Sequence, residues 1–286
     1  MEKIGFIGLG VMGYHMALNV TRKMDVPVIG YDISADRMDM YEASGGTAAS
    51  DDDEIYSTCD VILQMLPTHR TITDSVRKAV RLGTPGNIIV DLSSADPAII
   101  KELDIIVRDA GMHLLDSPVS GGNPMAEAGT LSVMTGGERD IFDRIRPVLE
   151  CMGTPVYTGP AGSGDTIKLI NNMIGGAMLA AYAEGCALAE ANGIDLNVLF
   201  EATRGGFIGG PLYENKIPKI ITRDFEPGAR IAVHYKDICN ALSFAEKTDM
   251  RLPVTEQIHE IMKWMVDNGY QDEDQAAMIR YFEEQM

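Results

Sequence analysis

Hydrophobic and polar positions change their pattern about halfway along the chain. In the first half, short apolar runs bounded by turn-forming residues alternate with longer amphipathic stretches. This alternation is typical of βαβ units on a largely parallel sheet. The apolar runs predict strands at residues 4–8, 26–31, 61–65, 88–91, 113–116, 131–135 and 155–157. The stretches between them predict helices at residues 12–23, 35–44, 70–80, 97–109 and 139–151.

The second half is helical in pattern throughout. After the glycine-rich segment 159–164, residues 165–192 form one long helical pattern rich in Ala, Leu, Met and Ile. Further helices are predicted at residues 195–203, 211–221, 232–248, 253–268 and 274–284. The change in pattern predicts two domains, an α/β domain over residues 1–162 and an all-α domain over residues 163–286.

Composition narrows the class of protein. The 286 residues carry a net charge of −18, with 45% hydrophobic and 23% charged side chains. This balance argues against nucleic acid and anionic membranes as partners, because both select basic surfaces. The four cysteines are widely spaced, the histidines lack metal-ligand spacing, and the chain does not start with a secretory signal pattern. The longest apolar stretch, residues 173–183, is too short to span a bilayer. We expect a cytoplasmic protein without a metal site.

A glycine motif predicts a dinucleotide site. Gly8-Leu9-Gly10-Val11-Met12-Gly13 follows the first apolar run and opens the first helical stretch. In a G-x-G-x-x-G turn the first glycine permits the tight turn, the second lets the backbone approach a pyrophosphate, and the third lets the helix pack closely. The helix N-terminus then offers unpaired N–H groups to the phosphates. Residues 1–162 are therefore predicted to form a Rossmann-type dinucleotide-binding domain with a mostly parallel sheet.

Asp32 stands at the end of the second predicted strand, directly after residue 31 and 19 residues after Gly13. An acidic side chain there can accept hydrogen bonds from the ribose hydroxyls of NAD, and it repels the 2′-phosphate of NADP. The alternative is a glycine-rich turn without a ligand, with Asp32 capping the next helix. Arg37 is near enough in sequence to meet a 2′-phosphate, but the acidic residue favours NAD over NADP.

Further short motifs follow along nearly the whole chain. They are Met65-Leu66-Pro67, Asp91-Leu92-Ser93-Ser94, Asp116-Ser117-Pro118-Val119-Ser120-Gly121-Gly122, the segment 126–131, Gly162-Ser163-Gly164 with Lys168, Asn171 and Asn172, and Lys236-Asp237. Their order resembles that of the β-hydroxyacid dehydrogenase family, which includes 3-hydroxyisobutyrate dehydrogenase and tartronate semialdehyde reductase.

The resemblance implies an activity and a set of cofactor contacts. The implied reaction is the reversible oxidation of a small 3-hydroxy acid, or the reduction of its semialdehyde, with a nicotinamide cofactor. By the same resemblance, Leu66, Pro67 and Ser94 would contact the cofactor, and Lys236 would lie near its nicotinamide end.

Lys168 is the candidate acid and base. When hydride leaves or joins a carbinol carbon, a proton must leave or join the oxygen, and a lysine can exchange it if its pKa is moved toward neutrality. Asn172 follows Lys168 at i+4 in the long helical pattern, so both side chains share one face. An amide there can hold the lysine or the substrate oxygen without competing for the proton. A surface lysine is the alternative, and the order of the motifs favours the catalytic interpretation.

Ser120, Gly121 and Gly122 form the candidate carboxylate site. Two glycines permit backbone shapes that turn successive N–H groups toward an anion, and the serine adds a hydroxyl donor. A tight turn after a strand is compatible with this role. Ser93 also follows a predicted strand end, where α/β sheets bind ligands. It fits equally well as the N-cap of the helix that begins at Pro97.

Two positions depart from the family pattern, and a third has two possible roles. His15 stands where the family usually has proline, and we expect altered packing rather than lost cofactor binding. Ala229 stands where an aromatic side chain is common, which changes the expected shape of the substrate site. Arg204 is either a receptor for a second anionic group of the substrate or a surface arginine.

The same residues bear on two alternative functions and on the assembly state. An imine reductase of similar architecture would favour NADP and replace the helix lysine, so Lys168 and Asp32 count against it. A non-catalytic nucleotide-binding regulatory protein is the third alternative. Helix residues 173–181 are apolar around most of the circumference and so predict a homodimer or homotetramer. Candidate substrates are 3-hydroxyisobutyrate, tartronate semialdehyde or glycerate, 4-hydroxybutyrate or succinic semialdehyde, and a hydroxymethyl glutarate.

Overall fold

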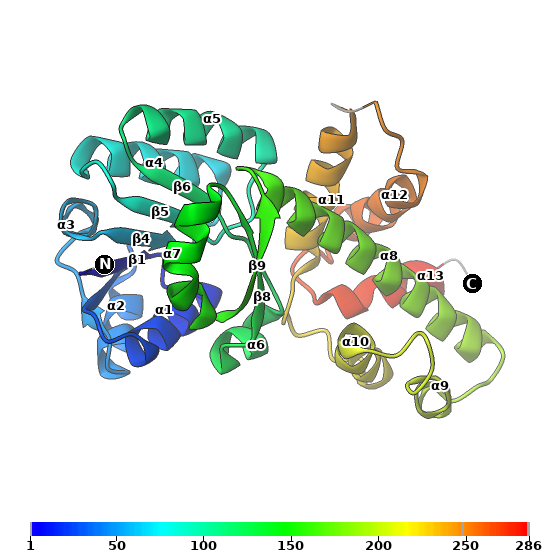
Figure 1. The fold of residues 1–286 in the computed structure, drawn as a ribbon. Coiled ribbons are helices and arrows are strands. Elements are labelled where there is room, and N and C mark those ends of the chain that lie inside the picture. The colour runs from blue at the N-terminus through cyan, green and yellow to red at the C-terminus, as the bar shows by residue number, and fades with distance from the viewer. Residues whose placement is uncertain (1, 247–248, 285–286) are drawn as a thin grey trace. The chain divides into compact units, whose positions relative to one another are not determined.

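The structure is a computed structural model that describes residues 2–246 and 249–284. The chain forms two compact units, Met1–Lys168 and Leu169–Met286. Helix α8 (Ser163–Ala191) begins in the first unit and continues into the second (Figure 1). The domain boundary at residue 162 stays a prediction from the sequence.

Among the described residues, nine strands of the first unit form one sheet. The parallel part has the order β3-β2-β1-β4-β5-β6. Its strands are β1 (Ile4–Ile7), β2 (Val28–Tyr31), β3 (Thr47–Ala48), β4 (Val61–Gln64), β5 (Ile88–Asp91) and β6 (His113–Asp116). This order confirms the predicted α/β fold with a mostly parallel sheet.

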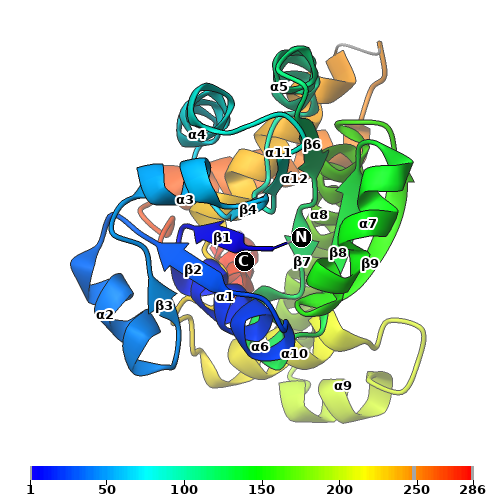
Figure 2. The same ribbon diagram turned by 60° about the vertical axis from the view of Figure 1, so that its left-hand side comes forward.

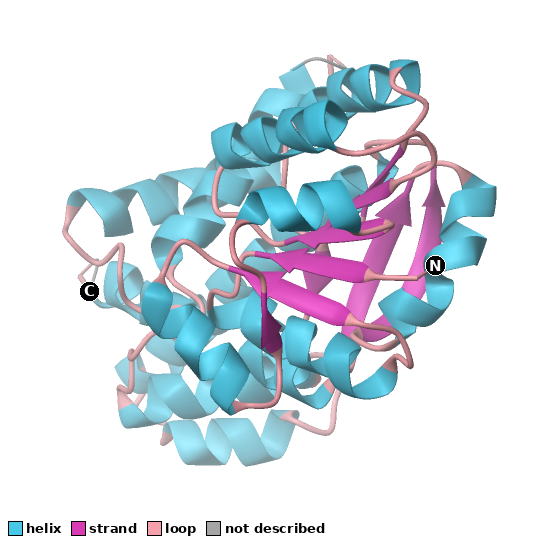
Figure 3. Ribbon diagram, turned by 90° about the vertical axis from the view of Figure 1, so that its left-hand side faces the viewer, coloured by secondary structure: helices cyan, strands magenta, loops and turns pink. Residues whose placement is uncertain are grey.

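Helices cover both faces of this sheet, which is magenta in Figure 3. Successive side chains of a strand point to opposite faces. Accordingly Ile4 and Phe6 of β1 belong to one buried apolar cluster, and Ile7 belongs to another. Strands buried on both faces carry continuous rather than alternating apolar residues. That is why short apolar runs marked these strands in the sequence.

The sheet changes direction at one end. β8 (Leu131–Gly136) runs antiparallel to β6 and to β7 (Val119–Ser120), and β9 (Gly153–Gly159) runs parallel to β8. β3 and β7 have two residues each and escape the sequence pattern, because two residues show no periodicity.

The helices of the first unit follow the predicted order with two additions. They are α1 (Val11–Lys23), α2 (Ala35–Ala43), α3 (Asp52–Thr58), α4 (His69–Leu82), α5 (Pro97–Asp109), α6 (Gly122–Ala128) and α7 (Arg139–Glu150). α3 is an addition to the predicted ranges, but the acidic run 51–54 favours a helix N-terminus, and α3 begins there, with Asp51 accepting a hydrogen bond from Glu54 N at 2.9 Å. α6 is the other addition.

The described part of the second unit is helical, as predicted. After α8 come α9 (Leu196–Thr203), α10 (Pro211–Thr222), α11 (Ile231–Glu246), α12 (Pro253–Asp267), a short 3-10 helix (Gln275–Met278) and α13 (Ile279–Glu283). The predicted helix over residues 232–248 ends in residues 247–248, which lie outside the described residues. The predicted helix over residues 274–284 is divided into the 3-10 helix and α13.

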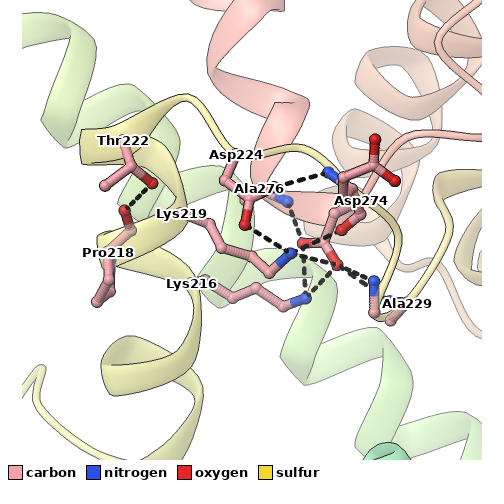
Figure 4. Close-up of polar contacts among 10 residues, drawn as sticks. Lys216, Pro218, Lys219, Thr222, Asp224, Ala229, Asp274 and Ala276 are labelled. Carbon is pink, nitrogen blue, oxygen red and sulfur yellow. Dashed lines mark hydrogen bonds and ion pairs between the residues drawn. The ribbon is translucent and has the colours of Figure 1, made fainter.

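A buried ion pair holds the segment that leads into α11 (Figure 4). Lys216 Nζ of α10 lies 2.8 and 3.0 Å from the two carboxylate oxygens of Asp274. The same carboxylate accepts hydrogen bonds from the backbone N–H groups of Gly228, Ala229 and Ala276, each at 3.0 Å. Three separate segments of the second unit therefore meet at one carboxylate.

Within residues 2–246 and 249–284, none of the helices is both long and apolar enough to cross a membrane.

Candidate active site

The three glycines of the motif between β1 and α1 differ in what surrounds them. A Cβ atom at Gly8, whose φ is +92°, would lie 2.2 Å from the Met65 carbonyl oxygen. A Cβ at Gly13 would lie 1.9 Å from the Gly8 carbonyl oxygen, whereas one at Gly10 would meet no described atom within 4 Å. The fold therefore requires Gly8 and Gly13, and Gly10 leaves the turn open on its outer side.

The first turn of α1 offers backbone N–H groups to an anion. Gly10 is the N-cap, and among the described residues no side chain caps this helix. The first turn also lacks an acidic residue. The first N–H groups of an α-helix have no intrahelical partner, and they lie at the positive end of the helix dipole. Because a Cβ at Gly10 would meet no described atom within 4 Å, the backbone beside this turn is open to an approaching phosphate.

Asp32 bridges the glycine turn and the loop after β2. Its Oδ2 accepts a hydrogen bond from Leu9 N at 2.7 Å, and its Oδ1 accepts one from Ser34 N at 2.9 Å. The N-cap of α2 is Ser34, so Asp32 does not cap that helix. Asp32 is partly exposed. Because a carboxylate has about four acceptor sites, it can still accept from ribose hydroxyls.

A serine links the ends of β4 and β5. Ser93 Oγ accepts a hydrogen bond from Leu66 N at 2.8 Å and donates one to Asp91 Oδ1 at 2.6 Å. Ser93 is therefore not the N-cap of α5, which is Asp96. Ser94 Oγ is buried and has no hydrogen-bond partner among the described residues, as expected of a group that a ligand would satisfy.

Two buried carboxyl groups at the strand ends have shifted titrations. Burial raises the pKa of Asp91 to about 6, although its hydrogen bonds from Ser93 act in the opposite direction. Burial also raises the pKa of Asp116 to about 6, against the hydrogen bonds from backbone N–H groups, and the charge of Asp91 adds to the rise. The sequence indicates both buried carboxyl groups, because each belongs to a charged residue that ends an apolar run.

Ser120 ends β7, and two glycines turn the chain from there into α6. The φ angles of Gly121 and Gly122 are +140° and +72°, a region that favours glycine. A Cβ atom at Gly121 would lie 2.7 Å from Met125 Sδ. The turn required at the candidate carboxylate site is therefore present.

The end of α6 is tied to α1, and Figure 2 shows the two helices side by side. Asn19 Nδ2 of α1 donates hydrogen bonds to the carbonyl oxygens of Ala126 at 2.9 Å and Glu127 at 3.2 Å. The helix that follows the glycine motif thus also fixes the segment that carries Ser120, Gly121 and Gly122.

Asn172 lies one helical turn after Lys168 on α8, and its amide is held in place. Asn172 Nδ2 donates to Asp237 Oδ2 at 2.6 Å, and Asn172 Oδ1 accepts from Asn171 Nδ2 at 3.0 Å. The His234 ring donates from Nε2 to the Asn172 carbonyl oxygen at 2.8 Å. These contacts fix both the side chain and the backbone of Asn172.

Asp237 joins two of the residues that the sequence singled out. Its side chain is 5% exposed, and its Oδ1 lies 3.3 Å from Lys236 Nζ. Asn172 and Lys236 therefore meet through Asp237 within the second unit. The sequence marked Asp237 only as part of a motif and did not mark His234. Their separations from Asn172, 65 and 62 residues, follow no spacing rule.

The structure decides between the two interpretations of Arg204. Its guanidinium donates two hydrogen bonds to Glu214, at 3.2 and 2.9 Å, and one to Glu201 at 2.8 Å. Its Cζ also lies 4.7 Å from the centroid of the Phe200 ring. A guanidinium already matched by two carboxylates is a poor receptor for another anion, so Arg204 is a surface arginine.

His15 is accommodated without interrupting α1. The helix runs through it, and its ring packs edge to face with Tyr14, with the centroids 5.1 Å apart. The proline that the family usually has at this position is therefore not needed to form the helix.

The glycine turn, the acidic residue after β2 and the unsatisfied groups at the strand ends define a protein that binds a nicotinamide dinucleotide. Two family models support this class. The NAD binding domain of 6-phosphogluconate dehydrogenase matches residues 3–161. The model described as NAD-binding of NADP-dependent 3-hydroxyisobutyrate dehydrogenase matches residues 162–282.

Relatives and solved structures match over the whole length. The chain is 32% identical to 2-(hydroxymethyl)glutarate dehydrogenase of Eubacterium barkeri, over 99% of this chain and 95% of the relative. It is 32% identical to 2-hydroxy-3-oxopropionate reductase of Escherichia coli, over 98% of this chain and 97% of the relative. The structure of Mycobacterium tuberculosis 3-hydroxyisobutyrate dehydrogenase with L-serine has a TM-score of 0.89 at 29% identity and covers 99% of both chains. The chain belongs to the β-hydroxyacid dehydrogenase family.

The imine reductase alternative is less favoured. An imine reductase from Myxococcus stipitatus in complex with NADP+ has a TM-score of 0.63 at 19% identity. That likeness shows a shared fold alone.

Proposed function

We propose that the protein is an NAD-dependent 3-hydroxyacid dehydrogenase, or semialdehyde reductase, in which Lys168 is the general acid and base. The observation that carries this proposal is the fixed amide of Asn172, one turn after Lys168 on α8. Asp237 and Asn171 occupy its two polar atoms at 2.6 and 3.0 Å. An immobilised amide beside a lysine suits a site that exchanges a proton at a defined position.

All but one of the proposed cofactor contacts come from the first unit. Gly8, Leu9, Gly10, Val11, Met12 and Gly13 would bind the pyrophosphate, and Leu66, Pro67 and Ser94 would line its path. The exception is Lys236, which the family resemblance alone assigns to the nicotinamide end. Asp32 favours NAD over NADP, because its carboxylate repels a 2′-phosphate.

The proton path in this proposal uses one lysine. A bound nicotinamide ring supplies the acceptor or donor for the hydride. In the oxidation direction Lys168, as a neutral amine, takes the proton from the substrate hydroxyl. In the reduction direction Lys168, as an ammonium, returns that proton to the carbonyl oxygen. Asn172 orients the reacting oxygen or the lysine.

The substrate would be a small anion bound at Ser120, Gly121 and Gly122. The serine hydroxyl and backbone N–H groups of this turn suit a carboxylate. The candidates are 3-hydroxyisobutyrate, glycerate or tartronate semialdehyde, 4-hydroxybutyrate or succinic semialdehyde, and 2-(hydroxymethyl)glutarate. Four relatives at 32% identity are named for a 2-(hydroxymethyl)glutarate dehydrogenase, a glyoxylate/succinic semialdehyde reductase, a 2-hydroxy-3-oxopropionate reductase and a probable 3-hydroxyisobutyrate dehydrogenase, so the panel to be assayed includes all of these substrates.

Activity on this panel tests the proposal. We expect turnover of at least one member followed at 340 nm, with kcat/KM for NAD exceeding that for NADP by about tenfold or more. Lys168→Ala should lower kcat by roughly 10²–10⁴-fold while the Kd for NADH changes little. Lys101→Ala, which removes an exposed lysine of α5, is the matched control. Full activity of Lys168→Ala would exclude the catalytic role, and NADH binding without turnover would favour a regulatory protein.

We also infer that α8 associates with a second copy of the chain. Large apolar side chains lie exposed at helical spacing along it: Ile167, Ile170, Ile174, Met178 and Leu188. An apolar stripe of this length on one helix is typical of a surface that packs against another subunit.

A further inference from the structure

The start of α8 is attached to the sheet by a carboxylate that has no exposed surface. Asp116, at the end of β6, is 0% exposed. Its Oδ1 accepts a hydrogen bond from Gly162 N at 2.8 Å, and its Oδ2 accepts one from Asp165 N at 3.0 Å. Hydrogen bonds to a carboxylate are about twice as strong as neutral ones. Both carboxylate oxygens of Asp116 therefore accept hydrogen bonds from backbone N–H groups at the start of α8.

A second carboxylate, on α8 itself, accepts a hydrogen bond from the segment after β5. Asp165, within the first turn of α8, is also 0% exposed. Its Oδ1 accepts a hydrogen bond from Ala95 N at 2.8 Å, directly after Ser94. The helix start is therefore held to the segment after β5 as well as to the end of β6.

Close packing restricts the same turn. A Cβ atom at Gly164 would lie 2.3 Å from the Met134 carbonyl oxygen and 2.6 Å from the Asp116 carbonyl oxygen. A Cβ atom at Gly136 would lie 2.6 Å from Asp116 Oδ1. Glycines at these positions let the helix start approach the backbone of β6 and β8 directly. Little room remains for the turn to shift.

Lys168 follows Asp165 by three residues, less than one turn. With a rise of about 1.5 Å per residue, its Cα lies about 4.5 Å along the helix axis from the residue that is held. A helix is stiff over that length, so any movement of the first turn moves Lys168 with it.

We propose that Asp116 and Asp165 are positioning residues for Lys168, which fix the first turn of α8 on the ends of β5 and β6. The inference rests on the proposed role of Lys168. Two buried carboxylates are a poor means of stabilising a fold, because each must leave water. They are a good means of fixing a helix in one place, since each oxygen accepts from a defined backbone N–H. Misplacing a reacting group by about 1 Å can lower a rate by about 10²-fold.

Rates of variants test the proposal. Asp116→Asn keeps one acceptor and places an NH₂ group against a backbone N–H, so it should lower kcat by roughly 10²-fold. KM for the best substrate of the panel and Kd for NADH should stay within about twofold. Asp165→Ala should behave alike, and Asp165→Asn, which keeps an acceptor for Ala95 N, should recover most of the lost rate. Asp195→Asn, at the N-cap of α9, is the matched control.

A double-variant cycle separates positioning from general damage. If Asp116 acts through Lys168, adding Asp116→Asn to Lys168→Ala should lower kcat no further, because the lysine is already absent. An additive loss, or a parallel loss of NADH binding, would overturn the proposal. If Asp116→Asn does not fold, the Asp165 variants carry the same cycle.

Chemical labelling keeps the inference separate from the proposed function. Acetylation of Lys168 by acetic anhydride can be followed against pH by peptide mass spectrometry, with Lys101 as internal reference. We expect Asp116→Asn and Asp165→Ala to change the pH profile of Lys168 and leave that of Lys101 unchanged. An unchanged Lys168 profile would refute the positioning role. Full activity of Lys168→Ala would refute the proposed function instead.

Discussion

Asp91 and Asp116 lie directly opposite each other as register partners at the ends of β5 and β6. Both are fully buried, and the pKa of each is raised to about 6. One bonds Ser93, which holds the backbone of Leu66, and the other bonds the start of α8. Two neighbouring carboxyl groups therefore anchor two segments of the candidate site.

The pH dependence of stability should reveal Asp91. Its pKa is about 6 in the folded protein and 3.8 for an unperturbed aspartate, so the folded state binds the proton more tightly. The resulting stabilisation is fully present below the unfolded pKa and is lost as pH rises through about 6. Relative to Asp91→Asn, the unmodified protein should gain about 1.4 kcal/mol between pH 7 and pH 5 in urea unfolding. Asp74→Asn, at an exposed carboxylate of α4, is the control. A constant difference between the protein and Asp91→Asn at both pH values would contradict this prediction.

The glycines of the turn should separate binding from folding. A Cβ at Gly10 meets no described atom within 4 Å, so Gly10→Ala should keep its unfolding free energy within about 0.5 kcal/mol. It should weaken NADH binding by about tenfold or more, because the methyl group occupies the space where the pyrophosphate approaches. Gly13→Ala should instead lose about 1–3 kcal/mol of stability or fail to fold, since its Cβ would lie 1.9 Å from the Gly8 carbonyl oxygen. Calorimetric titration and urea unfolding measure the two effects. Unchanged NADH affinity in Gly10→Ala would place the cofactor elsewhere.

Breaking the buried ion pair of the second unit should be costly. Lys216→Met leaves the buried Asp274 carboxylate with only Lys219 Nζ, 4.0 Å from Oδ2, as a nearby cation, and we expect a loss of about 3 kcal/mol. Arg230→Met removes an ion pair to Asp272 whose side chains are 53% and 69% exposed, and it should change stability by less than about 1 kcal/mol. Burial alone would raise the pKa of Asp274, but hydrogen bonds from Lys216 and from backbone N–H groups outweigh it and hold that pKa below its usual value. The contribution of Asp274 is therefore present above its unfolded pKa and lost as pH falls through the folded one. Equal losses in both variants would argue against this account.

The exposed stripe of α8 predicts the effect of a charge on assembly. Ile174→Glu should shift the mass measured by light scattering toward that of the monomer, because a carboxylate in an apolar interface lacks a partner. Ile105→Glu, at an exposed position of α5, should leave the mass unchanged. A monomeric mass for the unmodified protein would refute association through α8.

The fold follows from the sequence wherever a pattern is long. Strands such as β5 are buried on both faces and stand out as apolar runs, and α1 begins at a glycine motif. α6 escapes because its seven residues include Gly122, Asn123 and Pro124 and bury only Ala126. Its signals are Gly129, in the left-handed conformation that ends the helix, and the Asn19 contact from a distant helix.

The candidate site likewise contains residues that local motifs predict and residues that only the fold brings together. Local motifs identify the glycine turn, Asp32 and the Lys168/Asn172 pair, because their geometry depends on neighbours in sequence. Asp237 and His234 support Asn172 from another helix, and only the fold brings them there. The two interpretations of Ser93 were also separable only in three dimensions, where it bonds Leu66 N rather than capping α5.

The two hydrogen bonds of Asp32 constrain how this cofactor site can evolve. The side chain proposed to select NAD is also the one that ties the glycine turn, through Leu9 N, to the loop after β2. Replacing this carboxylate could admit a ribose that carries a 2′-phosphate. The same mutation would remove the acceptor for Leu9 N and so loosen the turn proposed to bind the pyrophosphate. A lineage changing its cofactor would therefore need a compensating acceptor for Leu9 N first. A redesign of the cofactor specificity would likewise have to supply the new acceptor for Leu9 N before Asp32 is replaced.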